Sequence, residues 1–248
     1  MLTMNCSVGG ATFRMLVSND WERFRVETVA TKEPETVEWI LENFRAGDTL
    51  FDIGANIGIY SILAAAGNPE GTVVAVEPMP GTFARLCQNA VVNELQNFHP
   101  YCLAVAARTG LGTFNFASLS EGSSMHSIGT SGATELFGET VVFRSGIGLV
   151  TLDDLAGVAG APSLIKIDVD GGEDDVLNGA EGVLRDPTLR SVLCEFNWPT
   201  GSAGPGRRDH RLLDAGFTAV RNGTEFERNS MTWRNTIYSR AVEPADAS

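Results

Sequence analysis

Residues 51–58 read Phe-Asp-Ile-Gly-Ala-Asn-Ile-Gly, and this stretch decides the fold. The short apolar run 49–53 that leads into it is typical of a buried strand, and the apolar run 57–66 predicts a helix. Between them, Gly54 allows the backbone to approach a ligand without a Cβ atom in the way, and Gly58 allows the next helix to lie close. A strand, a glycine turn and a helix start can together present backbone amides to an anionic group.

The same alternation of short apolar strands and amphipathic helices continues along the chain. We expect strands at 72–76, 98–105, 164–168, 191–196, 217–220 and 236–238, and helices at 35–44, 80–93, 173–184 and 209–215. This pattern predicts an α/β fold with a doubly wound, mostly parallel sheet and helices on both faces. Such sheets bind ligands beyond the carboxyl ends of their strands, near the point where the strand order reverses.

Three parts are expected along the chain. Residues 1–46 form a short N-terminal extension and a helix packed on the core, and residues 47–240 form the main domain. Residues 241–248 are expected to be a frayed tail.

Two segments break the alternation. Residues 118–138 are rich in Ser and Gly, and the runs 113–116 and 141–145 on either side predict an antiparallel insertion. Residues 200–206 form a second loop, just past a strand end. Loops on a rigid scaffold often carry specificity, so each segment is either a substrate-facing loop or a simple surface connection.

Four carboxylates stand at the expected ends of four strands: Asp52, Glu77, Asp168 and Glu195. Glu77 can accept hydrogen bonds from both hydroxyls of a ribose. The dinucleotide fingerprint requires a further glycine that residues 54–58 lack, and an acid at Asp52 disfavours a diphosphate. The same acid suits S-adenosylmethionine (SAM), which carries an ammonium and a sulfonium. Two alternatives stay open: an NAD-dependent oxidoreductase, and a purely structural glycine turn capped by Asp52.

Five motifs occur in a fixed order along the chain: FDIGANIG at 51–58, VVAVEP at 73–78, TLDDL at 151–155, SLIKIDVDGGEDDVLNGA at 163–180 and VLCEF at 192–196. In this order they resemble the FkbM-type methyltransferases, class I SAM-dependent enzymes of Rossmann-like fold that mostly O-methylate secondary metabolites and sugars. The resemblance implies a SAM pocket lined by Asp52, Gly54, Asn56, Gly58, Glu77 and Asp168, with Glu33 near the methionine end and Asp168 beside the transferable methyl. A catalytically silent SAM-binding protein of this fold is a further alternative.

The turn after Asp168 departs from the family pattern. The family usually reads Val-Glu-Gly-Ala-Glu there, whereas this chain reads Val-Asp-Gly-Gly-Glu at 169–173. Asp170 is therefore shorter than the usual glutamate, which leaves the choice of acceptor open if this residue holds the acceptor or a metal.

The candidate catalytic residues are Asp168, His126 and Glu195. Asp168 precedes a Gly-Gly turn, although it is also suited to capping the following helix. His126 titrates in the right range for a general base, although a loop histidine is more often a surface residue. Glu195 ends an apolar strand, where a carboxylate is unfavourable unless it is paired or faces a cleft. Magnesium would suit Asp168, Asp170 and Glu195, but nothing in the sequence fixes three ligands in one place, so no metal is favoured.

The chain carries 18 basic and 31 acidic residues, a formal net charge of −13. Such a surface repels phosphate backbones and anionic membranes, so the expected partner is a small-molecule hydroxyl acceptor rather than a nucleic acid or a membrane. The four cysteines are scattered and read as reduced thiols. The start lacks a signal-peptide pattern, and a soluble, cytoplasmic protein is expected. The oligomeric state is left open.

Overall fold

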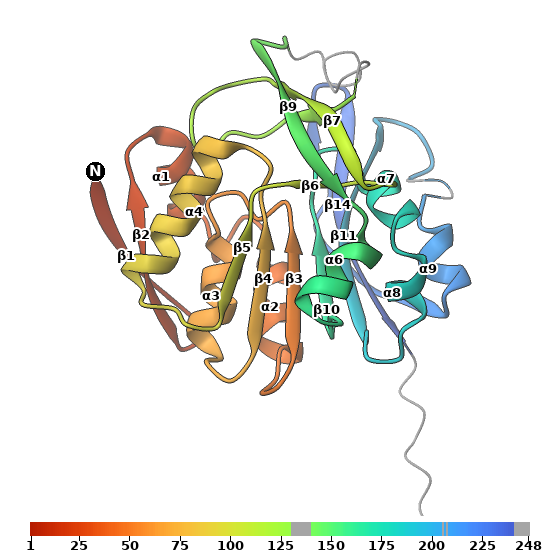
Figure 1. Cartoon of the computed structure of the whole chain (residues 1–248), viewed down its shortest axis with the longest axis horizontal. Helices are drawn as coiled ribbons and strands as arrows, with labels where there is room; N and C mark the ends of the chain where they lie inside the picture. Colours follow the sequence, from red (N-terminus) through yellow and green to blue (C-terminus); the bar gives the residue numbers. More distant parts are fainter. Residues whose placement is uncertain (130–139, 205, 207, 241–248) are drawn as a thin grey trace, which may run out of the picture.

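The computed structural model describes residues 1–129, 140–204, 206 and 208–240 (Figure 1). Its central sheet has the strand order β12-β14-β11-β10-β3-β4-β5, with β13 paired to β14. The strands are β3 (Thr49–Ile53), β4 (Thr72–Val76), β5 (Phe98–Tyr101), β10 (Leu164–Ile167), β11 (Ser191–Pro199), β12 (Phe217–Asn222), β13 (Phe226–Arg228) and β14 (Met231–Arg240). The five strands from β11 to β5 run parallel, and β14 runs antiparallel to β11. The predicted mostly parallel sheet is confirmed.

Helices cover both faces of this sheet. On one face lie α2 (Pro34–Asn43), α3 (Ile59–Gly67) and α4 (Pro80–Val92), and on the other α6 (Leu152–Ala159), α7 (Glu173–Asn178), α8 (Glu181–Arg185) and α9 (His210–Asp214) (Figure 1). Each set buries its apolar side chains in a separate core cluster against the sheet. The sheet is therefore doubly wound, as predicted.

The strand order reverses between β3 and β10. From β3 the chain builds outward through β4 to β5, and it then crosses back to place β10 on the other side of β3. The register pairs Ile53 with Ile167 and Ile167 with Cys194. The residues that follow these three, Gly54, Asp168 and Glu195, therefore lie next to one another at the carboxyl edge of the sheet, where ligands of such folds bind.

The N-terminal segment folds as the hairpin β1 (Leu2–Val8) and β2 (Ala11–Val17), followed by helix α1 (Asp20–Glu27). The hairpin packs on α3 and α4. Helix α1 was not expected from the sequence; Asn19 caps it by accepting from the amide of Glu22. Glu22 is fully buried and meets Arg85 of α4 with an Oε1–Nη1 distance of 2.7 Å. This ion pair fixes α1 to the core.

A second, smaller sheet forms the predicted antiparallel insertion. It has the order β6-β9-β7-β8, with β6 (Ala104–Val105), β7 (Gly110–Phe116), β8 (Ser127–Ile128) and β9 (Phe143–Val150). Residues 130–138 of the expected loop and the expected frayed tail at 241–248 lie outside the described residues.

Two of the expected elements are wrong, because the structure divides each of them into two. The strand expected at 98–105 divides, because β4 ends opposite Tyr101 and the chain then pairs with β9 in the second sheet. The helix expected at 173–184 divides at Gly179, where a Cβ atom would lie 2.4 Å from the carbonyl oxygen of Ala106. The break lets α7 approach the second sheet closely.

Gly54 tests how tightly β3 and β10 are joined. Its φ is +85°, and a Cβ atom would lie 1.8 Å from the backbone oxygen of Asp168. We expect Gly54→Ala to lower the free energy of unfolding by clearly more than the ~1–2 kcal/mol that a left-handed conformation alone costs. Gly201→Ala is the matched control, since Gly201 has the same φ of +85° with nothing within 4 Å. Urea denaturation measures both; equal losses would contradict the close contact.

Candidate functional site

A cavity of about 490 Å³ opens at the carboxyl edge of the sheet, around the point where the strand order reverses. Six of the predicted site residues line it: Gly54, Asn56, Glu77, His126, Asp168 and Glu195. A small adjoining cavity is lined by Glu33, together with Gly54, Asn56 and Asp168. The structure therefore brings seven of the predicted site residues around one pair of connected spaces.

Asp52 and Gly58 line neither cavity. Gly58 begins α3 with φ +87°, and a Cβ atom there would lie 2.7 Å from Cδ1 of Leu86, so the glycine serves helix packing. Asp52 is buried below the glycine turn, where its carboxylate accepts from the hydroxyl of Ser61 and pairs with Lys166. The predicted direct contact of Asp52 with SAM has no support in this arrangement.

The glycine turn and Glu77 are joined by hydrogen bonds. The amide of Asn56 donates to Glu77 Oε2 at 2.9 Å, and the amide of Met79 donates to Oε1 at 2.8 Å. Asn56 adopts a φ of +53°, which aims its amide at the carboxylate. Burial raises the pKa of Glu77 to about 7, although both amides oppose this. Each oxygen keeps a second lone pair that a ligand hydroxyl can use.

Residues 120–126, here called the closing segment, form one wall of the cavity through Ser123 to His126. They are tied to four separate parts of the fold, so the wall is assembled from the whole chain rather than from one loop. The tying side chains and their distances are Asn19 to Glu121 O (3.0 Å), Arg25 to Gly122 O (2.7 Å), Asn56 to Ser123 O (2.8 Å), Thr82 to Gly122 N (3.2 Å) and Asp170 to Met125 N (2.7 Å).

His126 is half-buried in this wall, against Phe114 and Phe116. Its Nδ1 accepts from the amide of Ala117 at 3.2 Å, so the neutral ring carries its proton on Nε2, which faces the hydroxyl of Ser123 at 3.2 Å. Burial lowers the pKa of His126 to about 4. With Nδ1 already accepting and Nε2 protonated, the ring has no free lone pair, and the geometry does not favour His126 as a general base.

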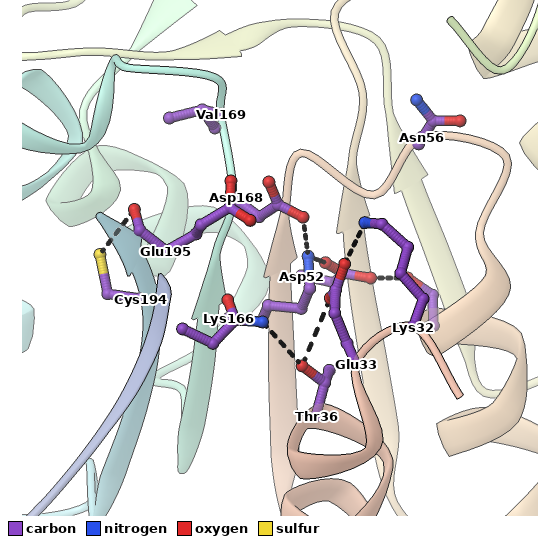
Figure 2. A network of polar contacts seen from close by, with 12 residues as sticks. Lys32, Glu33, Thr36, Asp52, Asn56, Lys166, Asp168, Val169, Cys194 and Glu195 are labelled. Atoms are coloured by element: carbon purple, nitrogen blue, oxygen red, sulfur yellow. Dashed lines mark hydrogen bonds and ion pairs between the residues drawn. The ribbon is translucent and has the colours of Figure 1, made fainter. Parts of the chain in front are cut away.

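Asp168 belongs to a row of three charges (Figure 2). The ammonium of Lys166 lies 3.0 Å from Asp168 Oδ2 and 3.4 Å from Asp52 Oδ1. Lys166 is 2% exposed, whereas the side chain of Asp168 is 26% exposed and faces the cavity. Burial acts to raise the pKa of Asp168, but the charges of Lys166 and Lys32 outweigh burial and hold it below its usual value.

Glu195 has the opposite protonation tendency. It lies beside Asp168 on the neighbouring strand, lines the cavity and is 5% exposed. Burial, followed by the charges of Asp168 and Glu33, raises its pKa well above the ordinary value. Two carboxyl groups with pKa values driven apart in one cavity provide an acid and a base side by side.

The small cavity carries charges of both signs. Glu33 is buried at the start of α2 and pairs with Lys32, while Arg25 of α1 reaches the same space. Burial acts to lower the pKa of Lys32, but Glu33 and Asp168 outweigh it and raise the value. Paired acids and bases suit a zwitterionic group such as the amino-acid end of SAM.

The turn after Asp168 is held by buried carboxylates. Asp170 adopts a φ of +54°, and burial raises its pKa to about 6. Glu173 accepts from the amide of Gly171 at 2.9 Å and pairs with Arg208 at 3.1 Å. Burial raises the pKa of Glu173 to about 7. Glu173 is therefore an internal brace of this turn.

Sequence reasoning missed the basic residues of the site. Lys166 carried a usable signal, because a lysine inside the apolar strand LIKID is unfavourable unless it is paired. Arg25 and Lys32 carried no such signal, because neither interrupts an apolar strand. The aromatic side chains Trp21, Phe24 and Phe226 at the cavity were also missed, because their contribution depends on tertiary placement.

Within the described part of the chain, no three His, Cys, Asp or Glu side chains are arranged to hold a metal ion. The described helices include none that combines the length and apolar character needed to cross a membrane.

Comparison with known proteins identifies the family. The model of the methyltransferase FkbM domain matches residues 52–219. The 31-O-demethyl-FK506 methyltransferase FkbM of Streptomyces tacrolimicus is 30% identical over 182 residues, which are 64% of this chain and 69% of the relative. The hexuronic acid methyltransferase AglP of Haloferax volcanii is 27% identical over 194 residues, 78% of this chain and 74% of the relative.

Solved structures give the same fold. Magnesium protoporphyrin IX methyltransferase of Synechocystis PCC 6803, solved with bound SAM, matches with a TM-score of 0.52 at 12% identity and covers 91% of this chain and 86% of that one.

The family match spans more than half of the chain and includes the turn at Gly54, Glu77, Asp168 and Glu195. It sets aside the alternative of an NAD-dependent oxidoreductase. The chain belongs to the FkbM family of methyltransferases and has the Rossmann-like α/β fold of class I SAM-dependent enzymes.

Proposed function

We propose that this methyltransferase transfers the methyl group of SAM to a hydroxyl oxygen of a small molecule bound in the main cavity. The observation that carries the proposal is the pair Asp168 and Glu195: two neighbouring carboxyl groups in one cavity, one favoured as an ion and the other as a neutral acid. The names of both relatives, a hexuronic acid methyltransferase and a 31-O-demethyl-FK506 methyltransferase, support a small-molecule or sugar acceptor.

SAM, the methyl donor, fits the side of the cavity that is lined by Glu77 and the glycine turn. Glu77 would accept from the ribose hydroxyls with its remaining lone pairs, while the turn at Gly54 and Asn56 lets backbone approach the ligand. Glu33, Lys32 and Arg25 would hold the amino-acid end through charges of both signs. These groups favour a zwitterion and offer no cradle of successive glycine amides for a diphosphate.

When bound, SAM supplies a methyl group on a cationic sulfur, which becomes a neutral thioether as the new O–CH₃ bond forms. Asp168 would accept the proton of the acceptor hydroxyl, and Glu195 would donate a hydrogen bond that orients the acceptor. The closing segment would exclude water. The main contribution of the protein is then alignment of the acceptor with the methyl group.

Exposed aromatic side chains mark the side of the cavity available to the acceptor. Trp21 and Phe24 of α1 are 45% and 50% exposed, and Phe226 of β13 is 39% exposed. Their faces suit a ring with apolar C–H surface, while Asp168 and Glu195 lie deeper. A ring-shaped acceptor could thus stack at the rim and present one hydroxyl to the carboxyl pair.

Glu77 tests the placement of the donor. At about pH 8.5, above the pKa of about 7 and therefore with Glu77 ionised, Glu77→Ala should weaken SAM binding by about 1.5–3 kcal/mol for each hydrogen bond lost to a charged acceptor. Isothermal titration calorimetry measures this, with Glu70→Ala as the control, because Glu70 is an exposed glutamate far from the cavity lining. Unchanged affinity in Glu77→Ala would remove this residue from the site.

Variants of Asp168 and His126 distinguish these two candidates for the general base. Asp168→Asn should lower kcat at saturating SAM by about 10²–10⁴-fold, because the neutral amide cannot accept the proton. His126→Gln should keep most of kcat and leave the pH profile unchanged. Mass spectrometry of metabolite pools incubated with SAM first identifies the acceptor by a gain of one methyl. A pH profile that loses its acidic limb in His126→Gln would instead make the histidine the base.

Trp21 tests the acceptor rim. Trp21→Ala should raise the KM for the acceptor about fivefold, equivalent to ~1 kcal/mol of aromatic contact, without changing the Kd of SAM. Phe143→Ala is the matched control, since Phe143 is equally exposed but lies outside the cavity lining. A loss of SAM affinity with no change in acceptor KM would assign Trp21 to the donor instead. Binding of SAM without methylation of any pool would favour the silent alternative.

A further inference from the structure

Lys166 is the most deeply buried cation around the site. It projects from β10, where Ile165 and Ile167 on either side are fully buried. A buried ammonium is stable only when it is paired, since burial alone would favour its neutral form. Its ammonium lies 5.5 Å from the centre of the Tyr60 ring and within ion-pair distance of two carboxylates.

The two carboxylates paired with Lys166 differ in access. Asp52 is 1% exposed and its other oxygen accepts from Ser61, so it is a fixed internal anion. Asp168 is partly exposed and faces the main cavity. Lys166 itself does not line the main cavity. It therefore connects an inner carboxylate to one that a ligand can reach, and the three groups sum to one negative charge.

We propose that Lys166 is a positioning residue that keeps Asp168 ionised and directed into the cavity, so that the site prefers a sulfonium ligand to a neutral thioether. This inference rests on the proposed function of the cavity. Lys166 lines the small cavity but not the main one, so toward the main cavity it acts through Asp168. A direct contact with the amino-acid end would affect SAM and its demethylated product alike, whereas the role through Asp168 affects the sulfonium alone.

Asp168 needs a directly paired cation to stay ionised, because it lies among several other acids. Without Lys166, burial and the nearby acids would favour the protonated form. The charged and titratable groups that face Asp168 from the elements packed around it are Arg25, Lys32, Glu33, Asp52, Tyr60, Lys166, Asp170, Glu173 and Glu195. Of the three cations in this set, Lys166 is the one that contacts the carboxylate directly, at 3.0 Å; Lys32 pairs with Glu33, and Arg25 donates to the closing segment.

The sign of the effect follows from the charge. An ionised Asp168 attracts a cationic sulfur, and this attraction is present above the pKa of Asp168 and is lost as the pH falls through it. Removing Lys166 raises that pKa, so the attraction is lost at a higher pH. Removing Asp52 has the opposite effect, since it deletes a neighbouring negative charge and leaves Lys166 to Asp168 alone.

The first experiment needs no ligand. Asp side chains are labelled with ¹³C at the carboxyl group, and the signal of Asp168, assigned with Asp168→Asn, is titrated by NMR in the protein alone. Lys166→Met should move the Asp168 titration to higher pH by about one pH unit or more, and Asp52→Asn should move it to lower pH. Arg190→Met is the control: Arg190 pairs with Asp48 away from the cavity, so Asp48 should respond and Asp168 should not.

The second experiment uses calorimetry with SAM and its demethylated product from about pH 4 to about pH 8. In Lys166→Met the pH below which the affinity for SAM falls should lie about one pH unit or more above that of the unaltered protein, with little change for the product, and Lys166→Arg should restore most of the preference. If Lys166→Met fails to fold, the expected shift of the Asp168 titration to lower pH in Asp52→Asn provides the test. An unmoved Asp168 titration in folded variants overturns the role of Lys166. Absence of SAM binding by the unaltered protein overturns the proposed function instead, while the NMR titration still decides on Lys166.

Discussion

The contact between the glycine turn after β3 and the backbone after β10 is the constraint on which the site depends. The carbonyl of Asp168 lies where a Cβ atom of residue 54 would be, so only glycine lets the two strand ends meet. Because the strand order reverses between these strands, the same contact fixes the floor of the cavity. Asp168 on one side and the turn leading to Asn56 on the other are thereby held in a fixed relation, and Glu195 follows through the register of β11.

Electrostatics then divides the carboxylates at this edge into different roles. The sequence places Asp52, Glu77, Asp168 and Glu195 at the expected ends of four strands. In the fold, Asp52 is an internal counterion, and Asp168 is ionised through Lys166. Glu77 and Glu195 are pushed toward their neutral forms by burial. The proposed attraction for the cationic sulfur therefore belongs to Asp168, as the family resemblance implies, and not to the buried Asp52.

The local sequence pattern predicted those strands whose bounds are set by a local run of apolar residues. Apolar runs such as 49–53 and 72–76 became β3 and β4 with the same bounds, because a doubly covered strand needs apolar residues on both sides. The divided strand at 98–105 could not be foreseen, since its end depends on where the neighbouring β4 stops. Helix α1 was missed because its packing rests on the Glu22–Arg85 pair, which joins distant parts of the chain. The environment of His126 was equally invisible, as its partners come from the folded closing segment.

The position of α1 in the chain has a consequence for how this enzyme can diversify. Trp21 and Phe24 precede the segment that matches the family model, and Phe226 follows it, whereas Glu77, Asp168 and Glu195 lie within it. The carboxyl groups proposed for the ribose and for the chemistry thus lie in one block, and the rim proposed for the acceptor is supplied by flanking sequence from both ends. Exchange of those flanks between relatives would graft new substrate preferences onto an unaltered reaction centre, which makes the termini the natural place to re-engineer selectivity.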